Sequence, residues 1–234
     1  MVLPEPERPV SQTTQPRAES GTTGRIHATL IAMLLSLRHR FIFIHIYKTA
    51  GTSLTHALRP FAREPLPARL LERAGLRKPA IAPLPDHVSA RDVRDAIPGE
   101  LFESCFKFAF VRNPWDWQVS LYHYMRELPR HPQHHVVAPL SFDEYIEWRV
   151  TSDKHLQTDF VTDESGQLLV DFVGRFENLD HDAQTVFERI GIRAAVPHRN
   201  RSFHDDYRTY YSDRSKRLVS EHFAGDIEMF GYSF

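Results

Sequence analysis

A lysine, a glycine and two hydroxyl residues stand close together where an apolar segment ends, in Phe41–Ser53 (FIFIHIYKTAGTS). Lys48 places a positive charge at the turn, and Gly51 lets the backbone approach a ligand closely. Thr52 and Ser53 offer hydroxyls and backbone N–H groups at the start of the expected helix, where the helix dipole favours an anion. These residues predict a phosphate-binding turn. The alternative interpretation is a strand–helix turn in which they only cap the helix.

The order of these residues excludes the commonest phosphate loop. Nucleotide triphosphatases use G-x-x-x-x-G-K-S/T, in which the lysine follows the glycines. Here Lys48 precedes Gly51, and no acidic residue at a later strand end clearly offers a magnesium ligand. We therefore expect phosphate binding without a metal.

A second basic residue, Arg112, follows another apolar segment in Phe106–Tyr122 (FKFAFVRNPWDWQVSLY). A charge at the end of a buried strand is costly unless it faces a crevice or is paired. Ser120 lies two helical turns beyond Asn113 on the same side of the expected helix. We therefore predict that Arg112 and Ser120 bind the same phosphate, with Arg112 making a forked contact. The alternative is that Arg112 only pairs with a carboxylate such as Asp116.

Both basic turns follow segments that have the pattern of buried parallel strands, and each is followed by a helix. The carboxyl ends of parallel strands meet at one edge of a sheet, where α/β proteins bind ligands. Two such turns can hold a ligand with a phosphate at each end, which indicates a nucleotide and group transfer. The predicted fold class is α/β: a P-loop-like three-layer α/β/α arrangement with a central parallel sheet. The strands are Phe41–Ile46 and Phe106–Val111, and the helices run from about Gly51 to Leu58 and, capped by Asn113 with Pro114 first, to about Leu128.

The remaining pattern divides the chain into a tail and one domain. Residues 1–24 are rich in Pro, Ser, Thr, Glu and Gln and are predicted to be disordered, and residues 25–234 are predicted to form a single domain. The further elements expected are a core helix over Thr29–Leu37, an irregular connection over Phe61–Pro85 with a helix at Ala68–Ala74, a helix over Ser89–Ile97, an exposed loop over Arg130–Leu140, a helix over Phe142–Val150, a hairpin or a loop and strand over Asp159–Val173, helices over Asn178–Ile190 and Ser215–Phe230, and a docked aromatic tail.

Composition excludes several classes of protein. The 234 residues carry a net charge of −1, so the chain lacks the basic field of a nucleic-acid binder. Its one cysteine, Cys105, cannot form an internal disulfide, which favours a reducing compartment and a cytoplasmic location. The longest apolar run, Thr29–Leu37, is about half the length of a membrane span, so no span is expected.

At this point the two motifs resemble those of sulfotransferases that use 3′-phosphoadenosine 5′-phosphosulfate. HIYKTAGTSL is similar to their 5′-phosphosulfate loop, usually HIPKTAGTS in the membrane-bound carbohydrate branch, and FVRNPWDWQVSLY to their 3′-phosphate motif. GRFENL (Gly174–Leu179) and the C-terminal HRNRSFHDDYRTYYSD (His198–Asp213) resemble later blocks, so the match covers residues from about 40 to the end. Tyr47 departs from the usual proline, and the N-terminal membrane anchor of the Golgi enzymes is missing, which suggests a soluble, bacterial-type relative.

The resemblance implies a role for each matching position. Lys48 would stabilise the leaving phosphate, and Arg112 and Ser120 would contact the 3′-phosphate. The 5′-phosphosulfate would be held by the loop and by the helix N–H groups that follow it, in Lys48, Thr49, Gly51, Thr52, Ser53 and Leu54. The product would be adenosine 3′,5′-bisphosphate, and no metal is expected.

Transfer to a hydroxyl requires a base, for which histidine is suited near neutral pH. The carbohydrate branch has its catalytic histidine between the two motifs, and His87 lies in a comparable stretch here. The alternatives are that His87 is a surface-loop residue, or that His45, which more simply packs inside, is the base. His131, His134 and His135 lack metal-ligand spacing and are interpreted as solvated.

The function predicted is sulfuryl transfer to a hydroxyl of an acceptor, most simply a glycan or glycoconjugate. Two alternatives stay open: a small-molecule kinase with a variant phosphate loop, and a non-catalytic nucleotide-binding module in which Tyr47 marks a degenerate loop. Acceptor specificity is expected in the segments Phe61–Pro85 and Arg130–Val150. Arg175, Arg199 and Asn200 fall in the resembling blocks and are candidates for contact with the cofactor or acceptor, and Arg201 and Arg208 add local positive charge.

Overall fold

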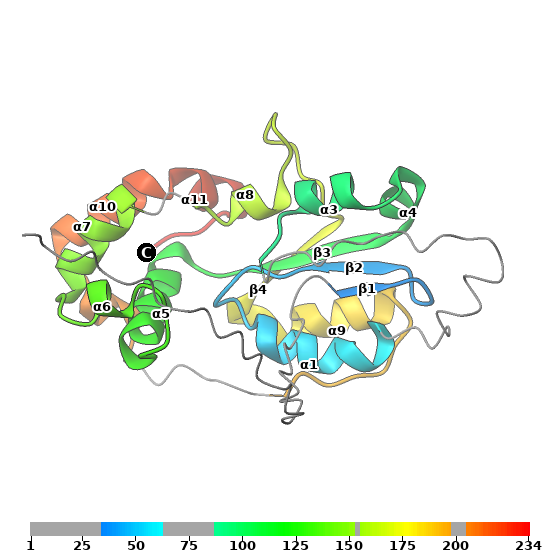
Figure 1. Ribbon diagram of the computed structural model, residues 1–234, viewed down its shortest axis with the longest axis horizontal. Helices are drawn as coiled ribbons and strands as arrows, with labels where there is room; N and C mark the ends of the chain where they lie inside the picture. Colours follow the sequence, from blue (N-terminus) through cyan, green and yellow to red (C-terminus); the bar gives the residue numbers. More distant parts are fainter. Residues whose placement is uncertain (1–33, 63–86, 153–154, 198–204) are drawn as a thin grey trace, which may run out of the picture.

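The computed structural model describes residues 34–62, 87–152, 155–197 and 205–234 (Figure 1). The predicted tail at residues 1–24 and the predicted helix Ala68–Ala74 lie outside these residues. The strands are β1 (Leu34–Ser36), β2 (Phe41–Ile44), β3 (Phe106–Val111) and β4 (Phe172–Arg175). The helices are α1 (Gly51–Ala62), α3 (Ala90–Ala96), α4 (Gly99–Ser104), α5 (Pro114–Glu127), α6 (His134–Val137), α7 (Phe142–Ser152), α8 (Thr158–Val161), η1 (Phe176–Asn178), α9 (Leu179–Arg189), η2 (Tyr207–Tyr210), α10 (Asp213–His222) and α11 (Ala224–Phe230).

The four strands form one sheet in the order β1-β2-β3-β4. β2, β3 and β4 are parallel, with Phe43 opposite Phe108 and Phe108 opposite Phe172, whereas β1 runs antiparallel to β2 at the edge. The α/β prediction is confirmed, and the sheet is mixed rather than wholly parallel. The helix predicted over Thr29–Leu37 is wrong in its described part, because Leu34–Ser36 is strand β1. A short apolar run has no periodicity that separates a buried helix from a strand.

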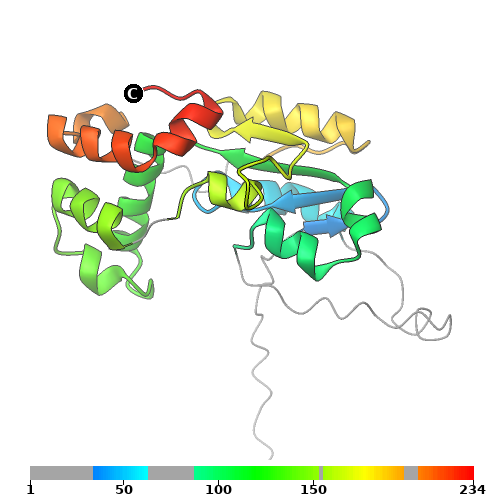
Figure 2. The ribbon, with the colours of Figure 1, turned by 90° about the horizontal axis from the view of Figure 1, so that it is seen from above.

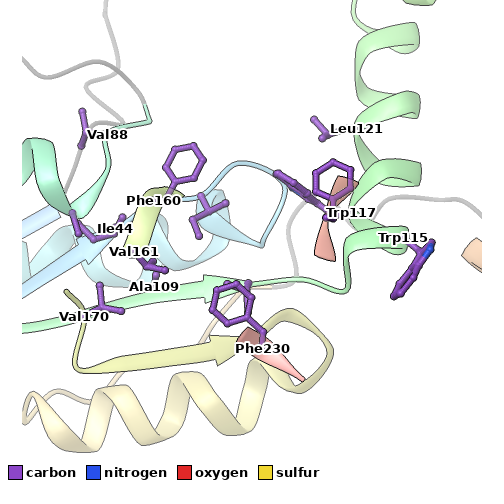
Figure 3. Close-up of a cluster of buried hydrophobic side chains, with 14 of the residues drawn as sticks. Ile44, Val88, Ala109, Trp115, Trp117, Leu121, Phe160, Val161, Val170 and Phe230 are labelled. Carbon is purple, nitrogen blue, oxygen red and sulfur yellow. The ribbon is translucent and has the colours of Figure 1, made fainter. Parts of the chain in front are cut away.

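Helices cover both faces of the sheet, which gives the predicted three layers (Figures 1 and 2). α1 and α9 pack on one face through Leu54, Leu58 and Phe187, against the phenylalanines of β2 and β3. On the other face, α3, α4 and α8 cover the alternate side chains of the same strands, among them Ile44 and Ala109 (Figure 3). This alternation buries β2 and β3 on both sides, as the continuous apolar runs predicted.

A second group of helices, α5, α6, α7 and α10, lies beside the carboxyl end of the sheet (Figures 1 and 2). α5 begins where predicted: Asn113 caps it by accepting from the Trp115 amide, and Pro114 is its first residue. The predicted docking of the aromatic tail is confirmed, because the Phe234 ring lies 5.6 Å from that of Trp115 and 5.5 Å from that of Tyr211.

Several predicted elements hold and others need correction. The helix after Ser89 is confirmed, with Ser89 and Asp92 in a capping box. The predicted loop Arg130–Leu140 contains α6, which buries Val137. The segment Asp159–Val173 combines the end of α8, a bridge between Thr162 and Leu168 around a tight turn, and the start of β4. The single helix predicted over Ser215–Phe230 is two helices, because the chain leaves helical geometry at Phe223.

Candidate active site

The first basic turn joins β2 to α1 in an unusual backbone conformation. Lys48 has a φ of 63° and Ala50 a φ of 65°, both in the left-handed region that non-glycine residues rarely occupy. Between them, the Thr49 hydroxyl donates to the Ile46 carbonyl at 2.8 Å and ties the turn to the strand. Gly51 then starts α1 directly against the His45 imidazole, where a Cβ would overlap the ring. The glycine is therefore required by packing as well as by any ligand.

The first turn of α1 presents its amides at this point. The first bond inside the helix runs from the Leu54 amide to the Ala50 carbonyl at 3.1 Å, so the amides of residues 51 to 53 have no carbonyl partner within the helix. Thr52 is exposed and the Ser53 side chain is buried. Leu54, also predicted to contact the ligand, has a fully buried side chain, and its amide is the one that donates to the Ala50 carbonyl. Its role in ligand binding stays a prediction.

Lys48 lies in an environment that lowers the pKa of its ammonium group. Its ammonium lies 4.3 Å from the centre of the Tyr124 ring on α5. Burial, and then the positive charge of Arg112, lower the pKa of Lys48 from 10.5 to about 8, while Glu127 acts in the opposite direction. A bound anion beside Lys48 would act in the same direction as Glu127 and raise this pKa.

Arg112 lies directly against the first turn. Its Nη1 donates to the Lys48 carbonyl at 3.3 Å, so the two predicted basic turns meet at one edge of the sheet. Its Nε donates to Asp116 at 2.7 Å, and its guanidinium lies 4.0 Å from the centre of the Phe176 ring. The alternative of an Arg112–Asp116 ion pair is thus present together with the proximity to Lys48. Ser120, the predicted partner, is buried one helical turn beyond Asp116 on α5.

A buried glutamine that the sequence did not single out holds the backbone of Arg112. The Gln157 side chain accepts from the Arg112 amide and donates to the Arg112 carbonyl, both at 2.8 Å. The amides of Gln157 and Thr158 in turn donate to Asp226 at 2.9 Å each. Asp226 is fully buried, and its burial raises its pKa. No local pattern marks Gln157, because its role depends on pairing across 45 positions of the chain.

The later sequence blocks also converge on the second turn. Glu177 accepts from the Asn113 amide at 2.6 Å, and the Asn113 side chain donates to the Ser233 carbonyl at 2.9 Å. Arg175 donates to the Phe230 carbonyl and stacks 4.8 Å from the Tyr232 ring centre. Arg199, Asn200 and Arg201 lie outside the described residues, and Arg208 pairs with Asp206 on the surface.

His87, the predicted base, lies beside the first turn. Its Nδ1 is 3.3 Å from the His45 carbonyl oxygen, and its ring meets the edges of the His45 and Tyr47 rings at 4.9 and 5.5 Å. A carbonyl oxygen can only accept, so Nδ1 carries the hydrogen of the neutral ring and Nε2 has the lone pair. That is the form a general base requires. The competing candidate, His45, is buried against Gly51 and Phe43.

Comparison with known proteins identifies the family. The profile described as "Sulfotransferase family" matches residues 32–233, nearly all of the chain. The chain belongs to the sulfotransferase family. It is also 31% identical over 119 residues to an uncharacterized protein of Archaeoglobus fulgidus, a match that covers 50% of this chain and 93% of its relative. Among solved structures it is similar to mouse sulfotransferase SULT7A1 complexed with PAP, with 16% identity, a TM-score of 0.49, and coverage of 83% of this chain and 86% of that one.

Two further observations on this sulfotransferase concern metal binding and membrane crossing. Within residues 34–62, 87–152, 155–197 and 205–234, no group of three or more His, Cys, Asp or Glu side chains is placed to hold a metal. His131 instead packs its ring against Tyr124 at 5.4 Å, and burial lowers its pKa. None of the helices in this part of the chain combines the length and apolarity that a membrane crossing requires.

Proposed function

We propose that this sulfotransferase moves a sulfuryl group from 3′-phosphoadenosine 5′-phosphosulfate to a hydroxyl group of a carbohydrate acceptor. The observation that carries the proposal is the contact between the two basic turns, in which Arg112 Nη1 donates to the Lys48 carbonyl at 3.3 Å. A donor with a phosphate at each end needs two cationic sites within its own length. Family membership favours sulfuryl transfer over the alternative of a small-molecule kinase.

The residues present suit the donor's charge. The 5′-phosphosulfate would lie at the first turn, against Lys48, Thr49 and the amides of residues 51 to 53, where the positive end of the α1 dipole adds to the lysine charge. The 3′-phosphate would lie at the second turn, against Arg112 and Ser120. Arg112 donates through Nε to Asp116 and through Nη1 to the Lys48 carbonyl, and a guanidinium carries five N–H donors in all, in the forked geometry that suits a phosphate.

The chemistry requires one bond to form as another breaks. The acceptor oxygen would bond to sulfur while the bond from sulfur to the 5′-phosphate oxygen breaks, which leaves adenosine 3′,5′-bisphosphate. Lys48 would stabilise the negative charge that grows on that leaving oxygen, an electrostatic contribution that is strongest where water is excluded. His87 Nε2 would accept the proton of the acceptor hydroxyl, because Nδ1 is directed at the His45 carbonyl.

The proposal also covers the acceptor class, the absence of a metal and the cellular location. A glycan acceptor is supported by the resemblance of the motifs to the carbohydrate branch. Transfer without a metal follows from a first turn that supplies its positive charge through Lys48. A cytoplasmic location is supported by the single cysteine, Cys105, which is buried and whose pKa burial raises, so that it is not a reactive thiol.

The test is Lys48→Ala. With a donor carrying radiolabelled sulfate and a library of glycans and small alcohols, we expect the wild-type chain to label an acceptor and the variant to turn over about 100- to 1,000-fold more slowly. Lys216→Ala is the matched control, because the Lys216 ammonium also lies over an aromatic ring, 3.8 Å from Phe234, but Lys216 belongs to α10 and to neither basic turn. Full turnover by the Lys48 variant would refute the proposed role. A wild-type chain that binds adenosine 3′,5′-bisphosphate yet labels nothing would favour the non-catalytic alternative.

The base is tested separately with His87→Ala. Loss of a general base lowers turnover by about 100- to 10,000-fold, and the affinity for adenosine 3′,5′-bisphosphate should stay within about twofold because His87 does not hold the phosphates. His56→Ala, at an exposed position of α1, is the control. An unchanged rate in the His87 variant would assign the proton transfer to another group.

A further inference from the structure

The strained conformation of the first turn needs an external support. Lys48 and Ala50 both have left-handed backbone angles without being glycine, and such unfavourable conformations persist only where the surrounding structure imposes them. The Thr49 hydroxyl supplies one contact within the turn. The larger set of contacts falls on Tyr47, the residue immediately before Lys48.

Tyr47 is held at both its backbone and its side chain. The Trp117 indole donates to the Tyr47 carbonyl at 2.8 Å, and the same indole stacks on the Tyr47 ring at 5.0 Å with the planes 30° apart. The edges of Phe160 and His87 close the ring in at 5.8 and 5.5 Å. Figure 3 shows Trp117 extending from α5 and Phe160 on α8, both in the buried cluster beside the sheet.

The Tyr47 hydroxyl is directed into the protein, where it accepts from Arg149 Nη2 at 3.1 Å. Arg149, on α7, is fully buried and also donates through Nε to Gln118 at 3.2 Å. Gln118 accepts from the Tyr145 hydroxyl as well, at 3.1 Å. A planar guanidinium that bonds in fixed directions to two neutral oxygens links α7 and α5 to the residue before Lys48.

Packing alone does not account for this arginine. A buried guanidinium is expensive to desolvate, and an apolar side chain of the same length often fills such a space at no loss of stability. What an apolar side chain cannot do is fix the position of a phenol oxygen. Arg149 therefore serves to fix the position of the Tyr47 hydroxyl rather than to fill space.

We propose that Arg149 and the Tyr47 hydroxyl are positioning residues that hold the first turn in the conformation from which Lys48 meets the donor. This inference rests on the proposed function, because it assumes that Lys48 binds the nucleotide. Neither residue needs to touch the ligand. Arg149 and Tyr47 affect ligand binding by holding the backbone of Lys48 in place.

The test is a double-mutant cycle of Tyr47→Phe and Lys48→Ala, measured as the affinity for adenosine 3′,5′-bisphosphate by calorimetry. Tyr47→Phe keeps the stacked ring and removes only the hydroxyl, so Tm should change little. We expect it to weaken binding about two- to tenfold in the wild-type background, as the loss of one hydrogen bond allows. In the Lys48→Ala background it should have no further effect, because the group being positioned is gone.

Tyr122→Phe is the matched control, because its hydroxyl also accepts from an arginine, Arg126 Nη1 at 2.7 Å, but holds no residue of the turn. We expect it to leave binding unchanged and to lower Tm at least as much as Tyr47→Phe. Arg149→Met should weaken binding as Tyr47→Phe does in the wild-type background and have no further effect in the Lys48→Ala background, a coupling that a merely structural role would not produce.

The outcomes distinguish a failure of the proposed function from a failure of the positioning role. A wild-type chain that fails to bind adenosine 3′,5′-bisphosphate would overturn the proposed function, and this inference with it. Wild-type binding with no change in Tyr47→Phe, or with equal losses in both Lys48 backgrounds, would overturn the positioning role alone. The same holds if Tyr47→Phe lowers Tm far more than Tyr122→Phe does, since its effect would then be structural.

Discussion

The titration of Lys48 gives a sharp prediction for nucleotide affinity. Burial and the neighbouring Arg112 lower its pKa to about 8, so the free protein should hold the charged form below pH 8 and lose it above. With that pKa, Lys48 is about nine-tenths protonated at pH 7 and about one-tenth at pH 9. A bound phosphate stabilises the cation and raises its pKa. The affinity for adenosine 3′,5′-bisphosphate should therefore fall about tenfold from pH 7 to pH 9.

The measurement is a series of calorimetric titrations between pH 7 and 9.5. The second pKa of a phosphate monoester is about 6, so the ligand's charge is nearly constant across this range. Lys48→Arg is the decisive comparison, because arginine keeps its charge and should remove the slope whatever its absolute affinity. An affinity that stays constant in the wild-type chain, or an equal decline in Lys48→Arg, would refute the assignment of Lys48 as a partly buried phosphate ligand.

Two further changes test how the turns are held. Gly51→Ala places a methyl group on the His45 ring and should destabilise the fold by about 1–3 kcal/mol in denaturant unfolding, whereas Gly99→Ala, with open space around it, should not; equal stabilities would contradict the packing. Gln157→Met removes both bonds to the Arg112 backbone and should weaken binding of adenosine 3′,5′-bisphosphate more than that of adenosine 5′-phosphate. Gln184→Met, on the surface of α9, is its control, and an unchanged preference for the 3′-phosphate would show that Gln157 does not act through Arg112.

The parts of the fold that were predictable are those that local chemistry determines. The apolar runs of β2 and β3 are short and rich in β-branched and aromatic residues, which favours buried strands, and Asn113 with Pro114 marks the start of α5. The errors lie where a segment depends on a distant partner. Leu34–Ser36 becomes a strand because β2 offers it an edge, and the hairpin region gains α8 because Asp226 caps its amides from α11. Neither partner is visible from within the segment.

The site residues that could be predicted are likewise those whose role is set by local chemistry. Lys48, Gly51 and Arg112 were visible because each has a chemical reason to stand at a strand end. The sequence could not decide whether Arg112 pairs with Asp116 or faces Lys48, because the two interpretations seemed exclusive. A guanidinium has several donors, and the structure uses Nε for Asp116 and Nη1 for the Lys48 carbonyl, so one residue does both.

Three of the residues that hold the two turns come from a single stretch of chain, the connection from β3 to β4. Trp117 and Arg149 fix Tyr47 before the first turn, and Gln157 fixes the backbone of the second. The same connection contains Arg130–Val150, where we expect acceptor specificity. Exchanging this connection between relatives to change the acceptor would therefore also alter donor affinity, unless the exchanged piece keeps these side chains. We therefore expect acceptor choice and donor binding to be physically linked, because the same connection would serve both.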